Sequence, residues 1–316
     1  MCLYSKLITN KKYISNKKNG GVIPAVKDER VLYVPVGCGR CIECTKQKAN
    51  NWRVRLHEEI RHNNNYTFVT LTFSDMSLIY LRSKLKELSY NIDNDIATKG
   101  VRYFLELWRK NNRTSLRHWL ITELGQNSTE RIHLHGIIDS RDIEQIKNTW
   151  KWGEVHSGTF VNEKTINYII KYVTKVDSKH KNFVPKILCS KGLGSNYLNR
   201  YDSNLNKFKG KETKEYYRTR DGVKMALPIY YRNKIYKEEE KELLWLNKLD
   251  KEERFVLGEK VSVKDSEEHY ENLLKYYRVI NKQLGYGDDS SNWDKKLYNR
   301  QKRMIKNLTK QAKRSN

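Results

Sequence analysis

Two apolar segments joined by a short polar loop place the strongest constraint on how this chain can fold. Leu116–Glu123 and Ile132–Ile138 are separated by the residues LGQNSTER. Segments of this kind predict the two strands of an antiparallel hairpin. If the loop is centred near Ser128, the pairing places Glu123 approximately opposite His133. Directly opposed residues of an antiparallel pair point to the same side of the sheet.

The segments on either side of this hairpin alternate between strand and helix patterns. Runs rich in β-branched and aromatic residues predict strands, and apolar residues at i, i+3, i+4 and i+7 predict a helix. In chain order we expect a strand at Tyr66–Phe73, a helix beginning near Val101, the hairpin, a helix at Asp142–Trp150, a strand at Glu154–Val161 and a helix capped by Asn162. This order predicts an α+β fold, in which helices pack on one central antiparallel sheet.

Two further regions lie outside this pattern. Residues 1–62 combine an extended arm rich in Lys, Asn and Gly with a cysteine cluster and a basic helix at Thr45–Arg61. Residues 181–316 are basic, rich in aromatic residues and mostly helical. We therefore predict an N-terminal arm with its helix (1–62), a central domain (63–180) and a basic C-terminal region (181–316).

The charge of the chain indicates a polyanionic partner. There are 62 Lys and Arg against 37 Asp and Glu, a formal net charge of +25, and 21 Tyr. Basic side chains bind phosphates with release of counterions, and tyrosines stack on unpaired bases. The C-terminal region interleaves both types, as in Tyr230-Tyr231-Arg232, and residues 295–314 contain no acid. This pattern fits either DNA contact or a solvated helical face.

No segment of the sequence has the character of a membrane anchor. There is no apolar run of about 18 residues, and the first residues (MCLYSKLITNKKY) lack the hydrophobic region of a signal peptide. We therefore expect a cytoplasmic protein that has no membrane partner.

Three of the five cysteines are closely spaced. Cys38, Cys41 and Cys44 form a Cys-x2-Cys-x2-Cys pattern, and Cys2 is a candidate fourth partner. An odd total argues against a secreted disulfide framework. Thiolates at this spacing can converge on a structural Zn²⁺ or on an iron–sulfur cluster. The alternative is a set of reduced thiols near a loop.

A pair of histidines lies on the second strand of the predicted hairpin. His133 and His135 are two residues apart, so both imidazoles project from the same face and can reach one metal ion. Glu123, if it lies opposite His133, adds a carboxylate and leaves coordination positions open. Such a mixed site suits Mg²⁺ or Mn²⁺ acting as a Lewis acid on a phosphodiester. The alternatives are a polar strand lining for the histidines and a solvated strand end for Glu123.

The segment TINYIIKYVTKV predicts a helix that presents two tyrosines. At about 100° per residue, one side of this helix carries Tyr168, Lys171, Tyr172 and Lys175. The opposite side carries Ile166, Ile169, Ile170 and Val173. Because the aliphatic residues already supply the core, we expect both tyrosines to face the metal-binding side. Neighbouring ammonium groups and a metal-polarised phosphate would stabilise a phenolate, and two nucleophiles permit two successive strand transfers.

Together these motifs resemble the HUH endonuclease superfamily. The shared pattern is a strand ending in LTFSD, then a Glu, then His-Leu-His on a strand, then a helix with Tyr-x3-Tyr. The order with tyrosine after histidine is similar to that of replication initiators and some transposases, and differs from that of relaxases. The segments MCLY, VPVGCGRCIECTKQKANNWRVRL and LPIYYRNKIY resemble the replication initiators of microviruses, particularly their gokushovirus-like branches.

This resemblance implies a site and a mechanism. The metal ligands would be His133, His135 and Glu123, on a ferredoxin-like or RRM-like core. The nucleophiles would be the two tyrosines, with Lys171 and Lys175 as motif lysines. The protein would nick single-stranded DNA at a phage origin in the host bacterial cytoplasm, keep the 5′ end as a phosphotyrosine, and later rejoin the displaced strand. A host polymerase would extend the 3′ end. Because the chain has no Gly-x4-Gly-Lys-Ser/Thr phosphate loop, unwinding would fall to a host helicase.

Three other functions fit parts of the pattern. An HUH-type transposase would use the same chemistry, although the basic C-terminal region and the cysteine segment suit it less well. A non-enzymatic single-stranded DNA-binding protein would also bind DNA in a salt-sensitive way, but only an enzyme would form a metal-dependent covalent adduct. A zinc hydrolase would use the His-x-His pair, but further ligands at suitable spacing are lacking nearby.

Overall fold

The computed structural model describes residues 2–85, 91–126, 130–158, 160–180, 183–264 and 266–290. The predicted loop centre at Ser128 and the acid-free stretch 295–314 lie outside these residues. The chain forms two compact units: a terminal unit of Met1–Gln47 with Glu238–Asn316, and a central unit of Lys48–Lys237. The boundary between Gln47 and Lys48 falls inside helix α1 (Ile42–His62).

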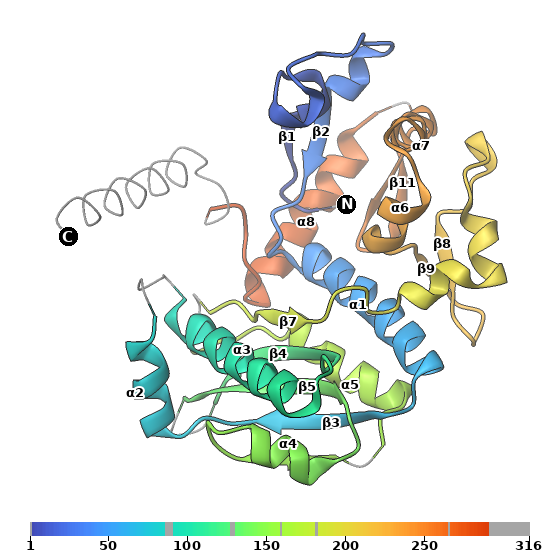
Figure 1. Ribbon diagram of the computed structural model, residues 1–316. Coiled ribbons are helices and arrows are strands. Elements are labelled where there is room, and N and C mark those ends of the chain that lie inside the picture. Colours follow the sequence, from blue (N-terminus) through green and yellow to red (C-terminus); the bar gives the residue numbers. More distant parts are fainter. Residues whose placement is uncertain are drawn as a thin grey trace. The chain divides into compact units, whose positions relative to one another are not determined.

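A five-stranded antiparallel sheet forms the centre of the central unit (Figure 1). Its strands lie in the order β6-β3-β5-β4-β7. They are β3 (Tyr66–Leu71), β4 (His118–Leu124), β5 (Ile132–Asp139), β6 (Val155–Ser157) and β7 (Ile187–Cys189). The helices around it are the larger part of α1, α2 (Asp75–Ser83), α3 (Ile92–Asn112), α4 (Ile143–Thr149) and α5 (Glu163–Thr174). The predicted α+β fold, with helices flanking an antiparallel sheet, is confirmed.

Both faces of the sheet are apolar, so helices cover each of them (Figure 1). Helices α2, α3 and α4 pack on the face that carries Leu120 of β4. Helix α5 and the central-unit part of α1 pack on the opposite face, which carries Ile121. Side chains alternate along a strand, so Glu123, His133 and His135 project from the same face as Ile121. The candidate metal ligands therefore lie on the side of the sheet that α5 covers.

The register of the β4–β5 hairpin positions these ligands. Glu123 pairs with His133, as the sequence predicts, and Leu120 pairs with Gly136. A Cβ atom added to Gly136 would lie 2.0 Å from the carbonyl oxygen of Trp119. Any larger residue at this position would push the two strands apart. Glycine is therefore required for the close pairing that brings Glu123 beside the histidines.

The rest of the central unit is held together by buried tyrosines. It contains the 3-10 helices η4 (Ser195–Asn199), η5 (Tyr201–Asn206) and η6 (Gly210–Glu212), strands β8 (Tyr216–Arg218) and β9 (Lys224–Ala226), and helix α6 (Ile229–Ile235). Tyr217 and Tyr231 are buried, and both rings contact that of Tyr197. The hydroxyl of Tyr231 donates to the carbonyl of Gly194 at 2.7 Å. These members of the basic and aromatic pattern are therefore core residues, not DNA-stacking residues.

The terminal unit contains two small antiparallel sheets and two helices of its own. Its elements are β1 (Lys6–Thr9), the 3-10 helices η1 (Lys11–Tyr13), η2 (Lys17–Asn19) and η3 (Glu29–Leu32), β2 (Tyr33–Val36), the start of α1, α7 (Glu238–Asp250), β10 (Glu253–Val256), β11 (Glu259–Ser262) and α8 (Glu268–Gln283). β1 pairs with β2, and β10 pairs with β11. The prediction of an extended arm over the first thirty residues was wrong. Asparagine caps build local turns there, as Asn10 and Asn16 accept the backbone N–H of Lys12 and Lys18.

Other predicted elements are present with shifted ends. Helix α3 begins at Ile92, ahead of the predicted start, and β6 is shorter than predicted. Strand β7 was not predicted, since its three residues are too few to show alternation; it pairs with β4 at the sheet edge. The C-terminal region contains the β8–β9 and β10–β11 pairs in addition to its helices. Within the described ranges, no helix combines the length and apolar character needed to cross a bilayer.

Candidate active site

Three side chains of the hairpin converge on one point. The Nε2 atoms of His133 and His135 lie 3.1 and 2.9 Å from the same oxygen, Oε2 of Glu123. One ligand atom from each of the three residues lies within 4.8 Å of the other two. Two imidazoles and one carboxylate on one side of an ion leave its other positions open. The group that the sequence predicts as a metal site is thus assembled in the folded chain.

The opposite ring nitrogens of both histidines are also held by hydrogen bonds. Nδ1 of His133 lies 3.2 Å from the carbonyl oxygen of Arg131, so this nitrogen carries the proton that the bond requires. Nδ1 of His135 lies 3.0 Å from the hydroxyl of Thr70, its partner in the β3–β5 register. With Nδ1 protonated, Nε2 presents a lone pair to a metal. These outer contacts therefore aim both rings at Glu123.

Sequence analysis did not identify Thr70. Its signal is present in the alternation of YTFVTLTF, in which Tyr66, Phe68 and Thr70 share one face. Phe68 also contributes, because its ring stacks on that of His135 with centroids 6.4 Å apart. The pairing of β3 with β5 was needed to connect this face with the histidines.

Glu123 is held in its ionised form. Burial alone would raise the pKa of its carboxyl, but hydrogen bonds from His133, His135 and Lys175 lower that pKa well below the usual range. Lys175 forms an ion pair with Oε1, whereas Oε2 faces the histidines. The two oxygens of one carboxylate thus serve different partners.

Helix α5 places two tyrosines against the histidines. Asn162 starts the helix by accepting the backbone N–H of Thr165. The aliphatic side faces the sheet as predicted, with Ile166, Ile169, Ile170 and Val173 all buried. The ring of Tyr172 stacks on that of His135, with centroids 4.3 Å apart and planes 14° apart. The hydroxyls of Tyr168 and Tyr172 lie 2.8 Å from each other.

The two tyrosines have different surroundings. Tyr168 is 48% exposed, and its ring meets that of Phe68 edge-on. Tyr172 is half-buried; burial first, and then Tyr168 and the charge of Glu123, raise the pKa of its phenol. Tyr172 is therefore neutral near pH 7 in the metal-free protein, and a positive charge beside Glu123 would oppose this effect.

The two motif lysines also differ. Lys171 is an exposed residue of α5. Helix α5 ends at Thr174, so Lys175 lies just past the helix and not on its face as predicted. Its extended backbone directs the ammonium to Glu123, and Nζ lies 5.9 Å from the centre of the Tyr172 ring. Lys175 thus connects the candidate metal ligand with a candidate nucleophile.

The stretch that holds all these groups can be compared with known families. Residues 66–177 match the family model of the replication-associated protein ORF2. The match begins with β3 and ends just beyond α5, so it includes Glu123, both histidines and both tyrosines. A replication-associated domain agrees with the function that the sequence resemblance implies. No curated protein and no solved structure matches the chain significantly.

Two open hollows border the site. One of about 370 Å³ lies beside His133 and is also lined by Ser74, Arg131 and Glu154. Another of about 380 Å³ lies along the first half of α5, where its lining includes Asn167 together with Arg53, His57, Arg61 and Arg220. Volumes of this size are typical of small-ligand sites.

Proposed function

We propose that this protein is a rolling-circle replication initiator of the microvirus type, an enzyme that nicks and rejoins single-stranded DNA at a phage origin. The match of residues 66–177 to a replication-associated family supports a role in DNA replication. The net charge of +25 supports a nucleic-acid partner. The chemistry itself is inferred from the geometry of the candidate site.

The observation that carries this proposal is the contact between α5 and the hairpin. Tyr172 stacks on His135, and its hydroxyl shares a hydrogen bond with Tyr168. Tyrosines that only filled the core would lie on the side of Ile169 and Ile170. These two lie on the other side, with both hydroxyls next to a predicted metal site. That is the arrangement a tyrosine nucleophile requires.

The residues present fit Mg²⁺ or Mn²⁺. Two neutral imidazoles and one ionised carboxylate supply nitrogen and oxygen donors, which suit these ions. When bound, such an ion would polarise a phosphodiester oxygen and offset the charge that develops at phosphorus. His133, His135 and Glu123 would hold it, and Thr70 would keep the His135 ring in place.

The proposed reaction is a transesterification. The hydroxyl oxygen of Tyr168 or Tyr172 attacks phosphorus, and the bond from phosphorus to the 3′ oxygen breaks. The products are a 5′-phosphotyrosine and a free 3′-OH, so the phenol proton is lost and the leaving oxygen gains one. The second tyrosine then repeats the step on the displaced strand, and the first linkage is attacked by the new 3′-OH to close a circle.

The surroundings of the site suit a single strand. The hollow beside His133 includes the guanidinium of Arg131, and the hollow along α5 includes three arginines. We propose that nucleotides flanking the scissile phosphate occupy these two hollows. The protein would act in the host bacterial cytoplasm, with a host helicase and polymerase completing replication.

The test uses labelled single-stranded oligonucleotides that tile the origin of the same genome. Purified protein is incubated with them in Mn²⁺ or in EDTA, and products are resolved on a denaturing gel. We expect a slow, protease-sensitive band that requires Mn²⁺ and disappears in the Tyr168→Phe and Tyr172→Phe double variant. The single variants assign the first nucleophile.

A matched control uses a tyrosine far from the chemistry. Tyr201 is 84% exposed on η5, so Tyr201→Phe should form the adduct at the wild-type rate. Salt-sensitive binding of every oligonucleotide without any adduct would refute the enzyme and leave a single-stranded DNA-binding protein. An adduct that persists in the double variant would refute the assigned nucleophiles.

A further inference from the structure

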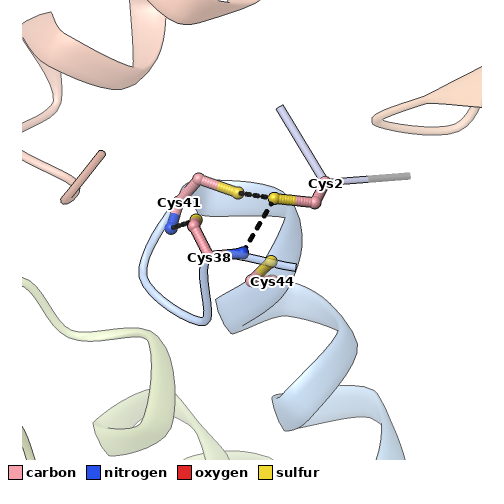
Figure 2. Close-up of side chains that lie close together, drawn as sticks. All are labelled: Cys2, Cys38, Cys41 and Cys44. Carbon is pink, nitrogen blue, oxygen red and sulfur yellow. Dashed lines mark hydrogen bonds between the residues drawn. The ribbon is translucent and has the colours of Figure 1, made fainter. Parts of the chain in front are cut away.

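Four cysteine side chains of the terminal unit face a common centre (Figure 2). Cys2 lies near the start of the chain, Cys38 and Cys41 lie in the turn before α1, and Cys44 lies in its first turn. The four Sγ atoms all lie within 4.8 Å of one another. Cys2, Cys38 and Cys41 are buried, and Cys44 is half-buried.

We propose that these four thiolates hold a structural Zn²⁺ ion. A tetrahedron with zinc–sulfur bonds of about 2.3 Å has edges of about 3.8 Å. The Sγ atoms of Cys2 and Cys41 lie 3.8 Å apart. A disulfide would need about 2.05 Å between sulfurs. An iron–sulfur cluster places several atoms between its thiolates, which therefore lie farther apart than around a single ion.

Backbone N–H groups already point at two of the sulfurs. The N–H groups of Cys38 and Tyr4 donate to Sγ of Cys2 at 3.1 and 3.3 Å, and the N–H of Cys41 donates to Sγ of Cys38 at 3.2 Å. Such bonds favour the thiolate form that a metal requires. Gly39 has a φ of +77°, a left-handed conformation that lets the turn fold back between Cys38 and Cys41. The turn is therefore shaped for ligands.

Helix α8 holds the two segments that carry these ligands. The guanidinium of Arg278 donates to the carbonyl of Leu3 at 2.8 Å, next to Cys2. The side-chain oxygen of Asn281 accepts the N–H of Ile42 at 2.8 Å, next to Cys41. Asn281 is itself buried. These contacts fix the outer shell of the site, as is usual for metal centres.

The ion would act as a cross-link within the terminal unit. Among the described residues, the buried cluster around it consists of Cys2, Leu3, Cys38, Cys41, Ile42, Val256 and Leu274, so three of its seven members are cysteines. A core with so few aliphatic side chains gains stability from a metal that joins distant segments. Soft thiolates also select Zn²⁺, whereas the site at Glu123 suits harder ions. The two sites would therefore hold different metals.

The experiment measures the metal content of the full chain. Protein is expressed in medium that contains both zinc and iron, purified without a metal-affinity step, and analysed by elemental mass spectrometry. We expect about one zinc per chain. The Cys38→Ser and Cys41→Ser double variant should fall to background. Cys189→Ser, which changes the exposed fifth cysteine outside the cluster, should keep its zinc.

A second control separates this site from the hairpin site. A His133→Ala and His135→Ala variant should retain zinc, since it leaves all four thiolates in place. Wild-type protein is also titrated with a thiol-reactive mercurial, which should release zinc as the thiols react; this measurement does not depend on the folding of any variant. The result does not rest on the proposed nicking activity.

Three outcomes would overturn the proposal. The first is wild-type protein without zinc whose thiols all react freely. The second is equal zinc in the wild type and the cysteine double variant. The third is stoichiometric iron in place of zinc, with the visible absorption of an iron–sulfur cluster.

Discussion

The hydrogen bond between Thr70 and His135 allows a quantitative test of the candidate metal site. Thr70→Val removes the hydroxyl that lies 3.0 Å from Nδ1 of His135 and replaces it with a methyl group of similar size. Loss of such a partner typically weakens metal binding 10- to 100-fold, or about 1.4–2.7 kcal/mol. The ring of His135 would remain stacked between those of Phe68 and Tyr172. We therefore expect a loss near the lower limit, about tenfold.

The assay is a Mn²⁺ titration followed by electron paramagnetic resonance, in which the signal of the free ion reports what remains unbound. Thr67→Val is the matched control, because Thr67 lies on the same strand but its hydroxyl donates to the carbonyl of Ser140 at 2.6 Å, on the other face. This control should bind Mn²⁺ like the wild type. Wild-type affinity in Thr70→Val, or an equal loss in both variants, would refute the idea that Thr70 orients the His135 ring.

Three further predictions concern charged groups. Lys175→Met removes the ion pair with Glu123, so Mn²⁺ should bind up to about fivefold more tightly in the same titration, while adduct formation slows. Burial keeps the pKa of His118 below 6.5, so the folded protein resists a proton that the unfolded chain accepts; the unfolding free energy should therefore fall as pH drops from 6.5, and urea melts should show a smaller fall in His118→Asn. Arg117→Leu leaves the buried carboxylate of Glu59 without its cation, and urea melts should show a loss of about 2–3 kcal/mol, less than for a fully buried pair because Arg117 is partly exposed.

The candidate site could be predicted from the sequence because its main residues depend on short-range geometry. Two-residue spacing on a strand fixes His133 and His135 on one face. The length of the loop fixes Glu123 opposite His133, as the register confirms. Helical periodicity separates Tyr168 and Tyr172 from the buried isoleucines of α5. None of these inferences needs a contact between distant segments.

Contacts between distant segments were the part that could not be predicted. The bond from Thr70 to His135 requires the pairing of β3 with β5, which no local pattern encodes. The ion pair of Lys175 depends on where α5 ends, and a single residue decides this. Cys2 meets Cys41 only because β1 pairs with β2 and returns the chain to the start of α1.

The requirement for glycine at position 136 matters to anyone who would transplant this hairpin. A designer who copied Glu123, His133 and His135 onto another scaffold would copy every group with a chemical role and still lose the spacing. The approach of 2.0 Å between an added Cβ and the carbonyl of Trp119 leaves no room for even a methyl group. The smallest graft is therefore four residues, and the fourth contributes by having no side chain.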